Sequence, residues 1–531
     1  MAEFFPTSDL PGDPTSIWLA STLETDNDGL EDDRTETAAH DETLTSDRTV
    51  DVAVIGGGIA GLSTAITLRE RGETVAVLER DRVATGTTGK STAKLTSQHG
   101  AIYDHLRREF GRRQATQYAR LQENAIDEVE RRIDELDIDC GFERHPSYLY
   151  SNEPDEIQRE TDAAQAAGLA ASYVTSVPPF ERAQAAVRFD EQAWFHPRQY
   201  LLGIAAELGG DDGAAIYEHT RVTDVEPGQP CCVRTREATV TAGRVVLATG
   251  FPILDRAGYF ARMHPKRSYV LGIRLDGDPP EGMYYRSGDN YRSVRTHRDS
   301  DGDLLLVGGE SHKTGQGGST ADRYRRLERW ARERFAVESI DYRWSTQDYQ
   351  TVDKVPFVGR VGPGGENVFV ATGFRGWGMT NGVAAGRLLA DLITGEHPRE
   401  RDLFSPLRFT PKTSLGTTLT ENADAASQFA TDWARTLLTP TLEALGPGEG
   451  RVVRRGGKPI ARARDDDGVL HTTSAVCPHL SCLVQWNDAE QSWDCPCHGS
   501  RFGIDGELLE GPATEDLPTR RPGADPNPDQ E

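Results

Sequence analysis

The 531-residue sequence predicts an α/β domain built on a parallel sheet, with an antiparallel sheet inserted into it, followed by a small β-rich domain. The first observation is a β-α-β pattern: an apolar strand at residues 50–55, glycines, a helix over 62–71 and a second strand at 74–78. The second is the alternation of polar and apolar positions over residues 260–345, which is typical of antiparallel strands. The third is the run of short strands and turns that begins near residue 447.

Composition narrows the possible partners and location. The formal net charge is -25, and there are only seven lysines, a composition typical of proteins from highly saline cytoplasm. Such a charge disfavours nucleic acid and anionic membranes as partners. No stretch approaches the ~20 apolar residues of a transmembrane segment, and the N-terminus lacks a secretory pattern. We therefore expect a cytoplasmic protein.

The elements follow one another in a recognisable order. Residues 1–48 are acidic and are expected to be mostly disordered, although residues 16–19 are apolar enough to dock on the folded body. A long helix is expected over residues 103–136, with one apolar face. Further buried strands are expected at 245–249 and 368–371, the latter followed by a helix that ends near residue 392.

Residues 56–61 match the pattern G-x-G-x-x-G between the first strand and the first helix. Gly56 permits a tight turn, Gly58 lets the backbone approach a pyrophosphate, and Gly61 lets helix and strand pack closely. The helix N-terminus offers N–H groups to phosphates, and Glu79 can accept hydrogen bonds from ribose hydroxyls. In this context the pattern predicts a dinucleotide site; a tight turn without a nucleotide is the alternative.

Three later segments accompany this motif at residues 86–93, 248–250 and 353–380. In that order they resemble the D-amino-acid oxidase-like flavoproteins, and the resemblance covers residues 49–404. It implies an FAD-binding Rossmann-like domain with an inserted substrate domain, roughly at 140–195 and 260–345. The FAD-binding residues expected from the motif and the resemblance together are Gly56, Gly58, Ile59, Ala60, Gly61, Glu79, Arg80, Gly86, Thr87, Thr88, Ser91, Thr92, Val222, Ala248, Thr249, Gly250, Gly373, Gly376, Gly378, Met379 and Thr380.

Two cysteine-histidine boxes lie near the C-terminus, Cys477-x-His479 and Cys495-x-x-His498. Two thiolates suit one iron of a [2Fe–2S] cluster and two imidazoles the other, which gives a higher potential than all-cysteine ligation. The same residue types allow a zinc site. Two additional cysteines and a Gly-Ser pair after the second box make zinc the weaker interpretation.

The spacing of the boxes resembles that of Rieske domains, here at residues 447–531 after a connector at 405–446. The resemblance implies that Cys477, His479, Cys495 and His498 are the metal ligands. It also implies a disulfide between Cys482 and Cys497 and a shielding proline loop at 511–513.

Two residues depart from the Rieske pattern. Ser481 replaces the usual glycine of the first box, and Phe502 stands where respiratory Rieske proteins have a tyrosine that hydrogen-bonds a ligand sulfur. Ser500, the other expected donor, is kept. Because hydrogen bonds to sulfur stabilise the reduced cluster, we expect a potential in the lower half of the roughly -150 to +300 mV Rieske range.

Together the two halves resemble a family of fused FAD-oxidoreductase/Rieske proteins. A second G-x-G-x-x-G motif for NAD(P)H is missing from the sequence, so electrons are expected to enter from a small amine or amino acid-like substrate. They would leave through the cluster to an external acceptor, a protein, a quinone or another molecule. The alternatives are a non-enzymatic electron-transfer or redox-sensing protein, and an O₂-dependent oxidase in which the cluster is auxiliary. A Rieske oxygenase is disfavoured because no His-x₄-His pair supplies its iron ligands.

The candidate substrate-binding residues lie in the region of the antiparallel sheet. Arg267, Tyr269, Arg292 and Arg295 could bind a carboxylate, and Glu310, His312 and Lys313 could face the flavin. For each of them the alternative is an ordinary structural or solvated polar residue. The substrate, the oligomeric state and the mode of flavin attachment do not follow from the sequence.

Overall fold

The computed structural model describes most of the chain. It covers residues 10–23, 43–210, 212–288, 290–299, 302–410 and 445–518, with single positions at 420, 429, 431 and 433. Most of the expected connector at 405–446 and most of the acidic segment at 1–48 lie outside the described residues.

The first layer is an eight-stranded sheet with the order β16-β17-β10-β1-β2-β7, in which β9 pairs with β10 and β8 with β9. The strands from β17 to β7 are parallel, and β16 and β9 are antiparallel to their neighbours. The bounds are β1 Arg48–Ile55, β2 Val75–Leu78, β7 Ala214–Tyr217, β8 Asp224–Glu226, β9 Cys231–Arg234, β10 Thr239–Leu247, β16 Phe357–Arg360 and β17 Val368–Thr372.

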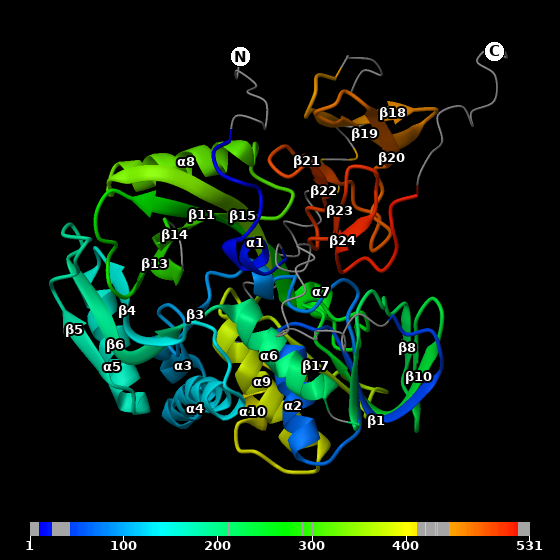
Figure 1. Ribbon diagram of the computed structural model, residues 1–531, viewed down its shortest axis with the longest axis horizontal. Helices are drawn as coiled ribbons and strands as arrows, with labels where there is room; N and C mark the ends of the chain where they lie inside the picture. Colours follow the sequence, from blue (N-terminus) through cyan, green and yellow to red (C-terminus); the bar gives the residue numbers. More distant parts are fainter. Residues whose placement is uncertain are drawn as a thin grey trace, which may run out of the picture.

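Alternate residues of β1 face two different cores. Val52 and Val54 pack with the helices α2 (Ile59–Glu70) and α9 (Gly378–Ile393), whereas Ala53 and Ile55 face the cluster that contains β9 and α7 (Tyr259–Arg262). Burial on both faces explains why the strand is apolar at successive positions. The parallel sheet expected from the sequence is therefore present, with α2 and α9 on one side of it (Figure 1) and the short α7 on the other.

The second layer is a nine-stranded sheet with the order β15-β11-β14-β13-β12-β4-β6-β3, in which β5 pairs with β6. Its pairs are antiparallel except that of β4 with β12. Helix α8 (Ala321–Arg332) covers one face, and on the other face Leu304 and Leu306 pack with Trp18 of the N-terminal segment. The bounds are β3 Lys94–Leu95, β4 Glu143–Ser151, β5 Ala171–Val174, β6 Ala185–Trp194, β11 Met263–Leu275, β12 Met283–Arg286, β13 Arg292–Asp299, β14 Gly302–Lys313 and β15 Val337–Thr351.

The long helix expected over residues 103–136 is two helices. Gly111 has φ +87°, a conformation that favours glycine, and it separates α3 (Tyr103–Glu109) from α4 (Arg112–Leu136). The expected apolar face is kept on α4, where Leu121, Ala125 and Val129 are buried. The remaining helices are α5 Pro154–Ala167, α6 Pro197–Gly209, α10 Arg401–Phe404 and the short 3₁₀ turn η2 Thr88–Lys90.

The N-terminal segment contributes one short helix, α1 (Ile17–Leu23). Trp18 is fully buried, and its Nε1 donates to the backbone oxygen of Ser91 at 2.7 Å. The docking expected for residues 16–19 is thus confirmed, and it places α1 against the loop that leads from η2 into β3.

The C-terminal domain contains two small antiparallel sheets around a core that includes Trp493, Phe502 and four cysteines. Figure 1 shows it, in orange and red, beside α7 and the end of the second sheet. The contact is close, because a Cβ on Gly499 would lie 2.5 Å from the side chain of Pro265 in β11. The bounds are β18 Gly450–Arg455, β19 Lys458–Arg464, β20 Leu470–Ser474, β21 Gln485–Asn487, β22 Ser492–Asp494, β23 Arg501–Phe502 and β24 Leu508–Glu510.

Candidate functional site

The glycine turn after β1 is packed against its neighbours. A Cβ on Gly61 would lie 1.8 Å from the backbone oxygen of Gly56, and one on Gly56 would lie 2.6 Å from that of Ala248. Gly58 gives α2 no side-chain cap. Among the described residues, Thr88 accepts from the N–H of Ile59, and the N–H groups of Ala60 and Gly61 remain for phosphate oxygens. Glu79 Oε2 accepts from Gly57 N at 2.6 Å, and burial raises the pKa of this carboxyl.

The loop at residues 86–92 closes over the same helix terminus. Thr88 Oγ1 accepts from Ile59 N at 3.2 Å, and Thr87 Oγ1 donates to the backbone oxygen of Gln347 at 3.3 Å. A Cβ on Gly86, Gly250 or Gly376 would have no neighbour within 4 Å. The three segments that the sequence related to FAD therefore converge on one region with room beside their glycines.

Two of the expected FAD-binding residues, Arg80 and Val222, contact other parts of the molecule. Arg80 Nη2 donates to the backbone oxygen of Leu509 in the C-terminal domain at 2.7 Å, and the arginine also pairs with Asp81. Val222 packs against the apolar cluster on the β9 side of the first sheet. These contacts direct the side chain of Arg80 toward the C-terminal domain.

Helix α9 begins at Gly378 and carries a polar contact with the loop after β3. Thr380 Oγ1 donates to the backbone oxygen of Thr96 at 2.6 Å. His99, which the sequence did not single out, stacks on Trp377 with 5.3 Å between ring centroids, and its Nδ1 lies 2.6 Å from Tyr118 Oη. Burial lowers the pKa of His99 to about 3, so its imidazole is neutral at physiological pH.

Asp348 of β15 is a second residue of this region that the sequence analysis did not predict as a site residue. Its Oδ2 accepts from the backbone N–H of Gly376, one of the expected FAD-binding residues, and Oδ1 accepts from Tyr349 N at 2.7 Å. Burial raises the pKa of Asp348 to about 6. Its place in the chain, five residues before the 353–359 motif, is the only signal that could have drawn attention to it.

The two cysteine-histidine boxes meet at one end of the C-terminal domain. A hydrogen bond from the Cys495 thiol lowers the pKa of Cys477, and the rings of His479 and His498 are 5.0 Å apart between centroids. Both Nδ1 atoms are buried and have no hydrogen-bond partner among the described residues. Two adjacent thiols and two imidazole nitrogens without partners fit the donor set of a mixed-ligand [2Fe–2S] cluster.

The remaining two cysteines of this region form the disulfide that the resemblance implied. Cys482 and Cys497 are bonded, with 6.5 Å between Cα atoms. Ser500 Oγ accepts from Ala513 N at 2.9 Å and hydrogen-bonds Cys477, so the proline loop at 511–513 is held against the cysteine site. Phe502 is fully buried in the same core.

Most of the candidate substrate-binding residues are occupied elsewhere. Arg292 pairs with Glu310, and Tyr269 Oη lies 2.9 Å from His312 Nε2. Both pairs lie on the face of the second sheet that α8 covers. Lys313 ends β14, opposite Lys266 in the register. These positions support the alternative that the polar side chains stabilise the fold and do not bind substrate; the residues concerned are Tyr269, Arg292, Glu310 and His312.

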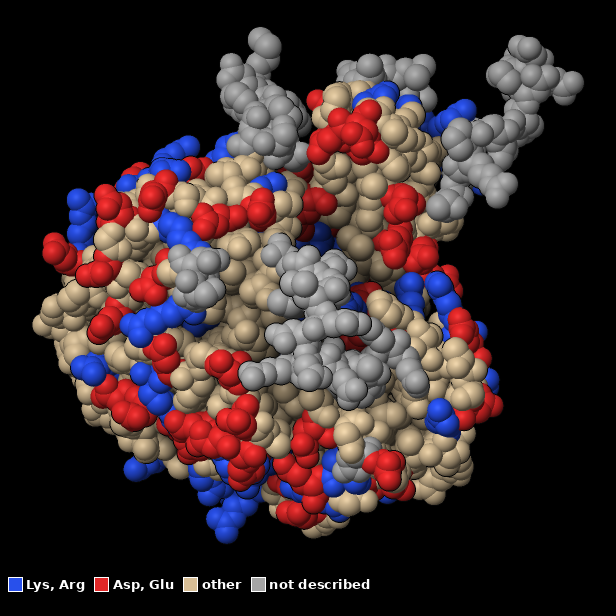
Figure 2. Space-filling model, in the orientation of Figure 1, with Lys and Arg blue, Asp and Glu red and all other residues tan. Residues whose placement is uncertain are grey.

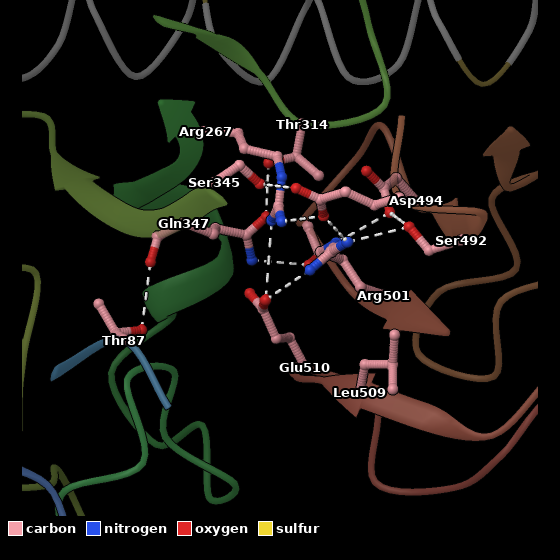
Figure 3. A network of polar contacts seen from close by, with 12 residues as sticks. Thr87, Arg267, Thr314, Ser345, Gln347, Ser492, Asp494, Arg501, Leu509 and Glu510 are labelled. Carbon is pink, nitrogen blue, oxygen red and sulfur yellow. Dashed lines mark hydrogen bonds and ion pairs between the residues drawn. The ribbon is translucent and has the colours of Figure 1, made fainter. Parts of the chain in front are cut away.

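Arg267 belongs to a buried ionic network between β11 and the C-terminal domain (Figure 3). It is 1% exposed and pairs with Glu490, and its Nη1 lies 3.6 Å from Glu510 Oε1. Arg501 of β23 pairs with both glutamates and with Asp494. Arg267 therefore fixes the C-terminal domain to the second sheet and is not open to a substrate carboxylate.

The strand β15 separates the two candidate cofactor sites. Gln347 Nε2 donates to the backbone oxygen of Gly499 at 2.8 Å, and Tyr349 Oη donates to that of Gly511 at 2.9 Å. Asp348, between them, faces Gly376. Phe251, directly after the Ala248–Gly250 segment, has its ring centroid 6.3 Å from His479 and 5.2 Å from Tyr349. Residues 347–349 of β15 thus contact both candidate cofactor sites, and Phe251 lies beside them.

Fold and sites define a class of protein: a flavoenzyme of the glycine-motif α/β type joined to a cysteine-histidine iron–sulfur domain. Residues 51–392 match the family model "FAD dependent oxidoreductase", and residues 437–521 match "Rieske [2Fe-2S] domain". The chain belongs to the FAD-dependent oxidoreductase family and carries a Rieske domain, so FAD and a [2Fe–2S] cluster are its cofactors.

The curated relatives differ in how much of the chain they cover. A Bacillus subtilis (strain 168) protein described as a Rieske 2Fe-2S iron-sulfur protein, YhfW, is 38% identical over 89% of this chain and 94% of its own length. The gamma-glutamylputrescine oxidoreductase of Escherichia coli (strain K12) is 27% identical over 70% of this chain and 89% of its own.

Solved structures share the fold of the larger part. Glycine oxidase from Geobacillus kaustophilus has a TM-score of 0.56 at 19% identity and covers 68% of this chain and 99% of its own. L-proline dehydrogenase from P. horikoshii has a TM-score of 0.57 at 17% identity and covers 68% of this chain and 98% of its own.

Among the helices that the structure describes, none combines the length and the apolar character that a membrane span requires.

Proposed function

We propose that this FAD-dependent oxidoreductase oxidises a small amine or amino acid-like molecule and passes the electrons through its Rieske cluster to an external acceptor. The observation that supports the electron route is that Gln347 contacts both Gly499, beside the expected cluster ligands, and Thr87 of the expected FAD loop. Tyr349 and Phe251 lie next to it, against Gly511 and His479. An electron leaving the flavin site would cross one strand of protein. The relatives named for amine and amino acid substrates support the substrate class.

The geometry supports an assignment of residues to each cofactor. The α2 N-terminus, Glu79 and the 86–92 loop would bind FAD, with Gly376, Gly378 and Thr380 at the α9 end. Cys477, His479, Cys495 and His498 would ligate the cluster. When bound, FAD accepts a hydride and the cluster exchanges single electrons.

The protein's own residues would shape the flavin environment. His99 is neutral and fixed by Tyr118 and Thr380, so it can donate or accept a hydrogen bond without adding charge. The hydroxyl of Ser500 is positioned on Cys477 by Ala513. We further propose the domain boundaries 49–404 and 447–531 and a cytoplasmic location, which the acidic composition supports.

The test is an anaerobic screen of amines and amino acids on the purified, iron-loaded protein. Flavin bleaching and the reduced-cluster EPR signal are followed in the same tube. We expect both signals for a true substrate, and neither in a tube without amine. A bleached flavin with an oxidised cluster would contradict the electron route. No bleaching by any amine, with both centres still reducible by dithionite, would contradict the enzymatic proposal and favour a relay.

A further inference from the structure

The loop that contains η2 has its backbone oxygens occupied one after another. Within the turn, the oxygens of Thr87 and Thr88 accept from Lys90 N at 3.2 Å and from Ser91 N at 3.3 Å. The next three oxygens belong to Gly89, Lys90 and Ser91, and each accepts from a side chain that is distant in the sequence. Because this loop lies outside the sheets, its carbonyls have no strand partner. The side chains therefore satisfy groups that the backbone alone leaves unpaired.

Two of the three donors come from the N-terminal segment. Ser16 Oγ donates to the first of these oxygens, and Trp18 Nε1 donates to the third at 2.7 Å. Trp344 of β15 donates to the middle one through Nε1 at 2.9 Å. The three donors are 1%, 0% and 4% exposed, so water does not compete for these hydrogen bonds. The guanidinium of Arg295 lies 5.1 Å from the ring centroid of Trp18 and helps to enclose the indole.

This segment is anchored to the folded body on both sides of the two donors. Before α1, Asp13 N donates to the backbone oxygen of Asp341, and the Asp13 oxygen accepts from Arg343 N, both at 2.8 Å, as a short strand beside β15 would. Within α1, Ser21 Oγ lies 3.0 Å from Nε2 of His196, the N-cap residue of α6. The positions of the two donors are therefore fixed by elements that lie apart from the loop.

The loop itself lies between two helices. Thr88 Oγ1 accepts from Ile59 N at the start of α2, and a Cβ on Gly58 would lie 3.1 Å from the same oxygen. A Cβ on Gly89 would lie 3.0 Å from Cδ2 of Leu19 in α1. Two neighbouring residues of η2 thus contact the helix terminus that would bind phosphate and the N-terminal helix.

We propose that residues 10–23 form an N-terminal clamp for the FAD loop, with Ser16 and Trp18 as positioning residues that hold residues 86–92 in the FAD-binding conformation. The clamp lies outside residues 51–392, which match the oxidoreductase family model, so a part of the FAD site is supplied by the segment that precedes the domain. A loop that is ordered before FAD arrives binds it more tightly, because ordering the loop no longer opposes binding. This inference holds whatever substrate the enzyme oxidises.

The experiment compares full-length wild type with Trp18→Phe, which keeps a buried aromatic ring and removes the N–H donor. FAD affinity is measured from the fluorescence of FAD released on serial dilution of the holo-protein, and the unfolding temperature of the FAD-free protein is measured beside it. We expect roughly fivefold weaker FAD binding, the equivalent of one hydrogen bond. The unfolding temperature of the FAD-free variant should stay close to that of wild type, because without FAD the released loop can open and its carbonyl regains water.

Unchanged FAD affinity in Trp18→Phe, with or without a lower unfolding temperature, would overturn the proposal, because the hydrogen bond would then serve only the fold. Ser16→Ala and Trp344→Phe remove the other two donors and should weaken FAD binding by a similar factor. Ser16→Ala keeps the test decisive should the tryptophan variants fail to fold.

Trp486→Phe is the matched control. Its Nε1 also donates to a backbone oxygen, that of Gly448 at 3.1 Å, but within the C-terminal domain. This variant should bind FAD as wild type does, and a loss of affinity equal to that of Trp18→Phe would overturn the proposal.

The readouts separate the clamp from the proposed function, since neither FAD affinity nor the unfolding temperature requires turnover. Saturating FAD should restore the visible flavin spectrum of the holo-protein in Trp18→Phe, because the groups that contact FAD are unchanged. A spectrum that excess FAD does not restore would overturn the positioning role. If no amine bleaches the flavin but the clamp variants lose FAD as expected, the proposed reaction fails and the clamp stands.

Discussion

At the scale of single residues, this chain depends on glycines whose missing side chains let two backbones touch. Gly61 is the extreme case, since a Cβ there would lie 1.8 Å from a backbone oxygen. Gly58 differs, because its Cβ would meet only the hydroxyl of Thr88 at 3.1 Å. In the glycine motif, Gly61 is therefore required for packing, whereas Gly58 leaves room for a ligand to approach the backbone.

Gly61→Ala should abolish stoichiometric FAD binding, because α2 must move away from the turn that it shares with β1. The measurement is the FAD-to-protein ratio of the purified variant. Gly210→Ala is the control: at that position a Cβ would make ordinary contacts of 3.6 Å or longer, so the ratio should match wild type. A fully loaded Gly61→Ala protein would contradict the packing argument.

Ser500 and Phe502 set the hydrogen bonding around the cysteines. Ser500 contacts Cys477, whereas Phe502 is buried and offers no donor. Phe502→Tyr should raise the cluster potential by roughly 40 mV, because one added hydrogen bond is worth about 1 kcal/mol and tenfold corresponds to about 59 mV for one electron. Ser500→Ala should lower it by a similar amount. Potentiometric titration followed by EPR measures both, and an unchanged or lower potential in the tyrosine variant would contradict the argument.

At the scale of elements, polar contacts that are largely shielded from solvent hold the C-terminal domain against β11 and β15. The main ones are ion pairs. Burial alone would raise the pKa of Glu490, but Arg267 and Arg501 lower it from 4.5 to about 2. The ionised carboxylate therefore stabilises the folded state above about pH 4.5. That contribution is lost as the pH falls from about 4.5 toward 2, where the carboxyl is protonated in the folded protein as well.

Glu490→Gln should lower the free energy of unfolding by roughly 3 kcal/mol at neutral pH. The difference from wild type should shrink as the pH falls below about 4.5. Urea unfolding, followed by the cluster's visible absorbance at several pH values, measures it. Glu333→Gln, whose exposed partner is Arg334, is the control and should change little at any pH. A difference from wild type that does not vary with pH would rule out the ionic explanation.

At the scale of the whole molecule, acidic side chains are spread over the face shown in Figure 2, with basic side chains between them. The net charge of -25 opposes compaction through self-repulsion. At 0.1 M salt the screening length is about 10 Å, and at 1 M it is about 3 Å. Surface charges that repel one another at low salt are therefore screened at high salt.

The unfolding temperature should consequently rise by several degrees between 0.1 M and 2 M KCl. Calorimetry or the loss of flavin absorbance measures it. Sucrose at matched water activity is the control, because it stabilises by exclusion without screening. A rise with sucrose equal to that with KCl would show that exclusion, and not charge, explains the effect.

The sequence alone determined the chemistry of each half. The glycine turn with Glu79, and the paired boxes at 477–482 and 495–500, are local in the chain, so their spacing identifies FAD binding and the Rieske domain before any contact is known. The sequence did not predict the helix break at Gly111. The spacing of apolar residues continues across this position, and it carries no information on the positive φ of one glycine.

Only the tertiary structure decided which polar residues are free to act. Arg267, Arg292 and Arg295 look alike in the sequence, yet the first pairs with an acid 223 positions away, the second with a cross-strand glutamate, and the third with none among the described residues. The same holds for Tyr349 and Phe251, whose contacts with the cluster loops depend on how two domains dock. The reason is physical: ligand-type motifs are set by neighbours in the chain, whereas burial and pairing are set by segments that meet only after folding.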